Sequence, residues 1–145
     1  MKVVGLDGRT HAWSLTGRVP RGDDPRPRSA GHRRARALLG RLFPFDNVLE
    51  EVHLPGCPAD LYADFVLPKK RLVVEVQGRQ HRAYVPHFHG SPAGFRAQRA
   101  RDLMKAEWCR LNTLWLATLD DDRDDDDWER AVRAALTGPR EAPPG

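Results

Sequence analysis

The feature that most constrains this 145-residue chain is a pair of acidic residues inside two apolar, strand-like runs. Asp64 lies in the run 61–67, Glu75 lies in the run 71–78, and a short basic turn joins the two runs. A carboxylate inside an apolar strand is costly unless it is paired or binds a metal ion. If the strands pair across the turn, both carboxylates can face one side and share a divalent cation. The pattern therefore predicts a metal-dependent hydrolase.

The distribution of charge points to a polyanionic partner. All but four of the 24 basic residues are arginines, and residues 18–41 carry eight arginines against two aspartates. Arginine forks match phosphate oxygens, so nucleic acid is the expected partner, although a basic surface that only keeps the protein in solution remains an alternative. Residues 120–129 carry eight acids against one arginine, and we interpret them as a solvated loop rather than a metal site.

Several classes of protein are disfavoured by the sequence. Cys57 and Cys109 lack the paired spacing of a zinc ribbon or a redox motif, and two cysteines do not make a disulfide framework. No apolar stretch is long enough to span a bilayer, and the first residues lack the apolar segment of a secretion signal. We expect a cytoplasmic protein without a membrane partner, in the host cytoplasm if the chain is phage-encoded.

The chain is expected to form one folded domain. Residues 1–28 read as an N-terminal hairpin or arm followed by a basic loop, residues 29–137 as the domain, and residues 138–145 as a disordered tail. Apolar periodicity predicts a helix from an N-cap at Ser29, strands, a second helix, a further strand and a last helix. The expected elements are a helix to about 43, strands near 48–54, 61–67 and 71–78, a helix over 92–111, a strand over 114–119 and a helix over 126–136.

This order, α-β-β-β-α-β, predicts an α/β fold with a mixed four-stranded sheet flanked by helices. In the helix over 92–111, Phe95, Leu103 and Trp108 are the expected core contacts. His32 and the arginines of the first helix are expected on a polar, strongly basic side.

Residues 29–119 resemble the PD-(D/E)XK nuclease superfamily, whose core has the same order of elements. In that family an Asp on the second core strand is followed, after a short hairpin, by Glu-X-Lys on the third, and here Asp64 and Glu75-Val76-Gln77 take those places. Since a glycine and a histidine follow the motif strand, the chain is most similar to small very-short-patch-repair-like endonucleases and phage-type resolvases.

The resemblance implies a restriction-endonuclease-like fold and hydrolysis of DNA phosphodiester bonds. It also implies a Mg²⁺ ion, replaceable by Mn²⁺, held by Asp64, Glu75 and the backbone carbonyl of Val76. Gln77 departs from the family, which usually has a lysine there, because an amide can donate a hydrogen bond but carries no charge. We expect the missing cation to come from Lys105, Arg101 or Arg99 of the following helix, with Lys105 as the catalytic candidate; each of them is otherwise a phosphate contact or part of a solvated face.

The family usually takes a third acid from its first helix, and residues 29–43 contain none. In the register set by Val48, Val52 and Leu54, Glu50 shares the apolar face, so Glu50 is the preferred extra metal ligand and catalytic acid. The alternative is that Glu50 pairs with neighbouring arginines.

Three histidines, His81, His87 and His89, follow the motif strand. His81 is the candidate general acid or base near neutral pH. A zinc site with a cysteine, or a loop that packs on the DNA or on the domain, are the other interpretations. Basic residues near the predicted site are expected to contact DNA phosphates, and they are Arg33, Arg34, Arg36, Lys69, Lys70, Arg79, Arg99 and Arg101.

These features predict a metal-dependent DNA endonuclease, either structure-specific or nicking, of the resolvase, repair or homing type. It would act as a homodimer where both strands are cut, because two related sites suit a two-strand cut. One alternative is a catalytically inactive DNA-binding or assembly protein that keeps the fold and has lost activity at Gln77. A separate, purely structural interpretation of the two acids is that Asp64 caps a turn and Glu75 forms a salt bridge to Lys69, Lys70 or Arg71. An RNA-directed nuclease is a further alternative.

Overall fold

A computed structural model describes residues 1–15, 29–78 and 92–138 of the chain. It contains a mixed four-stranded sheet flanked by helices, as the sequence predicted. In chain order the elements are β1 (Lys2–Val4), β2 (Thr10–Ala12), α1 (Ala30–Leu42), β3 (Leu49–Leu54), β4 (Leu61–Leu67), the 3₁₀ turn η1 (Pro68–Lys70), β5 (Leu72–Gln77), α4 (Pro92–Leu111), β6 (Trp115–Asp120) and α5 (Asp125–Thr137).

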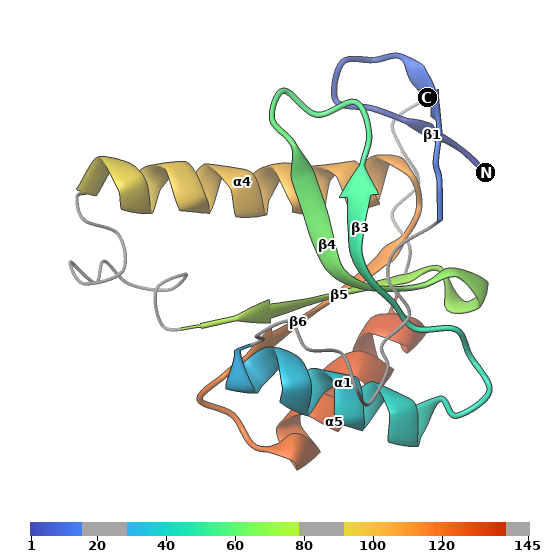
Figure 1. Cartoon of the computed structure of the whole chain (residues 1–145), viewed down its shortest axis with the longest axis vertical. Helices are drawn as coiled ribbons and strands as arrows, with labels where there is room; N and C mark the ends of the chain where they lie inside the picture. The colour runs from blue at the N-terminus through green and yellow to red at the C-terminus, as the bar shows by residue number, and fades with distance from the viewer. Residues whose placement is uncertain (16–28, 79–91, 139–145) are drawn as a thin grey trace.

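The sheet has the order β3-β4-β5-β6. The first three strands form an antiparallel meander, and β5 pairs parallel with β6 after the crossover that contains α4. Strand β5 is almost continuously apolar because helices cover both of its faces. Figure 1 shows α4 on one side of the sheet and α1 with α5 on the other.

Each face of the sheet buries its own core. On the α4 side, Trp108 packs against Val73 of β5 and against Trp13, which follows the β1–β2 hairpin, with ring centroids 5.1 Å apart. On the other side, Leu38 of α1 and Trp128 of α5 pack against strands β4, β5 and β6. The central strands are therefore buried between two helical layers, which makes a charged residue inside them expensive.

Side-chain caps and an interhelical arginine fix α1 and α5. The hydroxyl of Ser29 accepts a hydrogen bond from the backbone N–H of His32 at 3.1 Å, which confirms the predicted start of α1. Asp124 caps α5, so the acidic run is the end of β6, a turn and the start of this helix. Arg34 joins the two helices because its guanidinium lies 3.7 Å from the ring centroid of Trp128 and pairs with Asp125.

Two side chains lie where the sequence did not place them. Leu103 is 68% exposed rather than in the core, because it lines an open cavity beside the sheet instead of packing on the sheet. Figure 1 shows that the N-terminal end of α4 extends beyond strands β3 and β4. His32, expected on the polar side of α1, is only 8% exposed.

Among the helices of the described segments, none has the length and apolar character needed to cross a membrane.

Candidate active site

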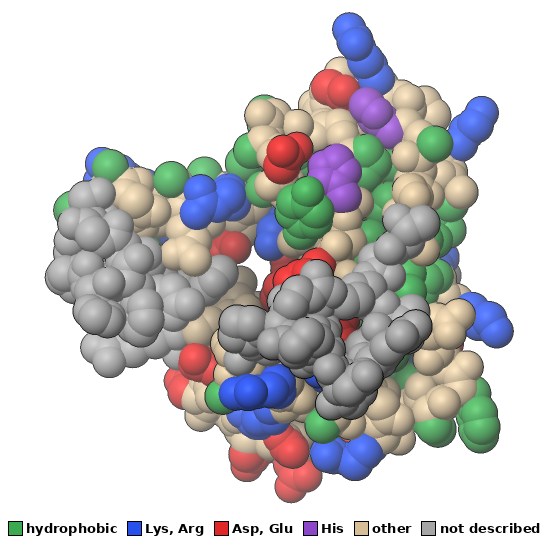
Figure 2. Space-filling model, in the orientation of Figure 1, with side chains coloured by type: hydrophobic (Ala, Val, Ile, Leu, Met, Phe, Trp, Pro, Cys, Tyr) green, Lys and Arg blue, Asp and Glu red, His purple; other side chains and the backbone are tan. Residues whose placement is uncertain are grey.

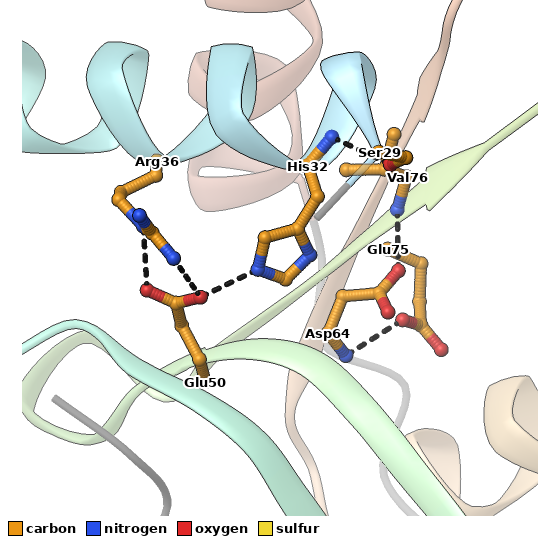
Figure 3. A network of polar contacts seen from close by, with 7 residues as sticks. All are labelled: Ser29, His32, Arg36, Glu50, Asp64, Glu75 and Val76. Atoms are coloured by element: carbon orange, nitrogen blue, oxygen red, sulfur yellow. Dashed lines mark hydrogen bonds and ion pairs between the residues drawn. The ribbon is translucent and has the colours of Figure 1, made fainter. Parts of the chain in front are cut away.

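Strands β4 and β5 stop pairing at Asp64 and Glu75. Their antiparallel ladder runs from Leu67 opposite Leu72 to Phe65 opposite Val74 and ends there. Beyond it the two acids bond to backbone groups instead: Glu75 Oε2 accepts the N–H of Asp64 at 2.9 Å, and Asp64 Oδ2 accepts the N–H of Val76 at 2.9 Å. The two carboxylates therefore lie side by side where the strands separate (Figure 3).

Lys105 of α4 reaches this pair from one face of the sheet. Its Nζ lies 2.8 Å from Glu75 Oε1, and the two side chains are only 19% and 10% exposed. The cationic partner of Glu75 is thus Lys105 and not a residue of the basic turn. Of the three cations that the sequence offered on this helix, Lys105, Arg101 and Arg99, it is Lys105 that pairs with Glu75.

The electrostatics of this cluster are unbalanced. Burial and the neighbouring Asp64 carboxylate raise the pKa of Glu75 to about 8, although Lys105 opposes the change. Burial lowers the pKa of Lys105, but the charges of Glu75 and Asp64 outweigh it and raise that pKa above its ordinary value. One lysine therefore compensates two adjacent carboxylates only in part.

A cavity of about 210 Å³ opens between α4 and the end of β5. It is lined by Glu75, Gln77, Arg99, Asp102, Leu103, Lys105, Ala106, Leu116 and Thr118. Gln77, the third motif position, therefore lies at the same cavity as Glu75 and Lys105. Sequence reasoning missed Asp102, whose signal was its place one helical turn from both Arg99 and Lys105.

The side chains present fit a hard divalent cation. The Asp64 and Glu75 carboxylates are adjacent, and Lys105 compensates their charge only in part, which is a setting that favours a bound cation. Carboxylate and carbonyl oxygens are the ligands that Mg²⁺ prefers, and Mg²⁺ keeps several waters. Within the described residues, no three His, Cys, Asp or Glu side chains are grouped closely enough to hold a metal. A metal here would thus have two carboxylates rather than three.

Glu50 is not part of this pair. It is fully buried against α1, and its carboxylate accepts hydrogen bonds from His32 Nε2 at 2.5 Å and from Arg36 Nε and Nη2 at 2.9 and 3.0 Å. The strand pattern placed Glu50 on the face of Val52 and Leu54, but those two residues belong to the opposite core.

The alternation of β3 changes because the residue after Glu50, Glu51, has a φ of 53°. The arginine pairing that the sequence left open for Glu50 is the arrangement that the structure contains.

The predicted DNA-contacting residues have different surroundings. Arg34 and Arg36 bind acids within the domain, and Lys70 lies 3.3 Å from Asp46. Arg33, Lys69, Arg99 and Arg101 are exposed. Arg79 and the three histidines His81, His87 and His89 lie outside the described residues. Figure 2 shows acidic side chains near the middle of one face with basic side chains beside them.

Comparison with known proteins gives one match of interest. No protein-family model matches the chain, and no solved structure matches it. A stretch of 57 residues is 40% identical to "Uncharacterized protein 307L" of Invertebrate iridescent virus 6, which covers 39% of this chain and 29% of the viral protein. The chain therefore spans less than a third of that relative, and it is similar to a viral protein whose name states no activity.

Proposed function

We propose that this chain is a metal-dependent DNA endonuclease with a restriction-endonuclease-like fold. The observation that carries the proposal is the convergence of Asp64, Glu75 and Lys105 where two buried strands separate. Two carboxylates and a lysine in a buried position are costly for folding, and such arrangements concentrate at functional sites. A purely structural pair would need only one acid for one lysine.

The topology supports the same proposal. The order α1-β3-β4-β5-α4-β6, with three antiparallel strands and a parallel fourth, is that of the PD-(D/E)XK core. Asp64 lies on the second strand of this sheet and Glu75 on the third, as the family motif requires. Residues separated by one hairpin are thus brought together by the register that the fold imposes.

Asp64, Glu75 and the backbone carbonyl of Val76 would hold the Mg²⁺ ion. When bound, Mg²⁺ neutralises charge on the phosphate and lowers the pKa of a water ligand. Lys105 places an ammonium group beside the carboxylates, where it can donate hydrogen bonds to a phosphate oxygen. Gln77 faces the same cavity and offers an uncharged amide, so Lys105 supplies the charge that Gln77 lacks.

Exposed basic side chains provide the contacts to the DNA backbone. Arg99 lines the cavity itself, and Arg33, Lys69 and Arg101 are exposed on the same domain. Such contacts set affinity and are weakened by salt, but they do not read sequence. We therefore propose structure-directed or nicking cleavage, with a homodimer where both strands are cut.

Cleavage assays test the proposal directly. Supercoiled, linear, branched and single-stranded DNA, with RNA alongside, are incubated with the protein in Mg²⁺, in Mn²⁺ and in chelator. We expect metal-dependent cleavage of DNA that is lost in Asp64→Asn and in Glu75→Gln. Glu107→Gln changes an exposed acid of α4 that pairs with Arg110, and this matched control should cleave like the wild type.

Each outcome distinguishes the proposal from one alternative function. Gel shifts that are the same for the wild type, Asp64→Asn and Glu75→Gln, with no cleavage in any divalent ion, would identify a DNA-binding protein that keeps a nuclease fold. Cleavage of RNA alone would identify a ribonuclease. Cleavage that persists in both Asp64→Asn and Glu75→Gln would place the active site elsewhere.

A further inference from the structure

His32 is buried, and among the described residues only one of its two ring nitrogens has a hydrogen-bond partner. Its Nε2 lies 2.5 Å from Glu50 Oε1, and its ring stacks on Phe65 with centroids 4.5 Å apart. Only 8% of the residue is exposed, and Nδ1 forms no hydrogen bond with the segments that the structure describes. A buried polar atom without a partner is costly, so Nδ1 is suited to a ligand or water.

The free nitrogen lies on the Asp64 side of the imidazole. In Figure 3 the ring stands between the carboxylates of Glu50 and Asp64, with the edge that carries Nδ1 turned away from Glu50 and toward Asp64. Phe65, on which the ring stacks, directly follows Asp64 in β4. His32 thus flanks the acidic pair from the α1 side of the sheet, whereas Lys105 approaches from the α4 side.

A glycine brings α1 close enough for this placement. A Cβ at Gly31 would lie 3.1 Å from Cγ1 of Val76, so a larger residue here would require the Val76 side chain to shift by a few tenths of an ångström. Val76 is the residue whose N–H binds Asp64. The first turn of α1 is therefore packed on the side chain of Val76, one residue beyond Glu75.

Glu50 and Arg36 hold the imidazole in one orientation. Glu50 is fully buried and is bound through both oxygens by Arg36, so its negative charge is compensated. A carboxylate can only accept hydrogen bonds when ionised, and it therefore fixes Nε2 of His32 as the donor. In the neutral ring this leaves a lone pair on Nδ1, as in other carboxylate–imidazole pairs at catalytic sites.

We propose that Nδ1 of His32 accepts a hydrogen bond from the water that attacks the scissile phosphate, and so orients that water beside Asp64. This inference rests on the proposed nuclease function and adds a residue to it. His32 is then a catalytic residue, and Glu50 with Arg36 are positioning residues that act through it. The competing interpretation is that His32 serves only to satisfy the buried charge of Glu50.

Two substitutions separate these interpretations. The amide of His32→Gln can reach the position of Nε2 and keep a donor to Glu50, but it leaves nothing at the position of Nδ1. The amide of His32→Asn lies near the position of Nδ1 and is too short to bind Glu50. A water-orienting role therefore predicts that the Gln variant is stable and much less active than the wild type, while the Asn variant is less stable but more active than the Gln variant. A purely structural role predicts the opposite ranking of activity.

Cleavage rate, melting temperature and DNA gel shift are measured for both variants well below their melting temperatures. We expect His32→Gln to lower kcat by about 10²-fold, with KM and gel-shift affinity within about twofold of wild type. His53→Gln replaces an exposed histidine of β3 and is the matched control for the substitution itself. It should leave all three measurements unchanged.

The outcomes distinguish this inference from the function on which it rests. A His32→Gln protein with wild-type kcat overturns the role of His32 and leaves the nuclease proposal intact. If His32→Gln is unstable, the activities of the two variants are compared. An activity of His32→Asn below that of His32→Gln overturns the inference, and an activity above it supports the inference. A wild-type protein that cleaves no DNA with any divalent ion overturns the nuclease proposal and the inference with it.

Discussion

Glu75→Gln should make the metal-free protein more stable than the wild type, and this difference should grow as pH rises. The pKa of this carboxyl moves from an ordinary value of 4.5 to about 8 on folding, because of burial and the adjacent Asp64 charge. The folded state thus holds the proton more tightly than the unfolded state. The free energy of unfolding of the wild type therefore falls as pH rises from about 4.5 to about 8, and it is constant with respect to this group above that range.

The magnitude follows from the size of the pKa change. Each pKa unit corresponds to about 1.4 kcal/mol, so a rise from 4.5 to about 8 costs the wild type about 5 kcal/mol once Glu75 is ionised. Glutamine resembles the protonated carboxyl in shape and keeps an acceptor for the N–H of Asp64. We expect the variant and the wild type to be similarly stable near pH 5. Above about pH 8 the variant should be more stable by several kcal/mol.

Urea unfolding in chelator at several pH values measures the difference. Groups that titrate alike in both proteins cancel in the comparison. Glu107→Gln, at an exposed acid whose pKa is lowered by its bond to Arg110, should show the same pH dependence as the wild type between about pH 5 and about pH 9. Adding Mg²⁺ should stabilise the wild type at high pH and leave Glu75→Gln nearly unaffected. A difference between the two proteins that stays constant from about pH 5 to about pH 9 would refute the reasoning.

Three further predictions concern the cations. Arg36→Met should lower the free energy of unfolding by about 3 kcal/mol, because it leaves the buried Glu50 carboxylate without the arginine that binds both of its oxygens. A urea titration measures this, and an unchanged unfolding midpoint would contradict it. Arg34→Ala should lower the free energy of unfolding by about 1 kcal/mol, because the contact of Arg34 with Trp128 of α5 is lost. Most of this loss should persist at high salt, where ion pairs are screened, and thermal unfolding at low and high salt measures it. Lys105→Met should reduce the rate of DNA cleavage by about 10²-fold or more, and adding Gln77→Lys should restore part of that activity. A double variant that cleaves no faster than Lys105→Met would argue against the idea that a lysine at position 77 can replace Lys105.

Much of the fold could be predicted from sequence because local rules determine it. Ser29 begins α1 as its N-cap, and the helix over 92–111 has the bounds that the periodicity predicted. The apolar runs around Asp64 and Glu75 became adjacent antiparallel strands, since a short turn leaves few other pairings. Leu103 shows the limit of this reasoning, because a periodic pattern cannot show where a cavity opens between a helix and the sheet.

The sequence by itself determined the α/β class, the order of the elements and the pair of acids on neighbouring strands. Only the tertiary structure decided which groups surround that pair: Lys105 from α4 on one side, and His32 held by Glu50 on the other. A left-handed backbone at Glu51 reverses the alternation of β3, and no period-two pattern anticipates such a break. Contacts between distant segments depend on strand twist, helix placement and charge compensation in the core, and these arise only when the whole chain has packed.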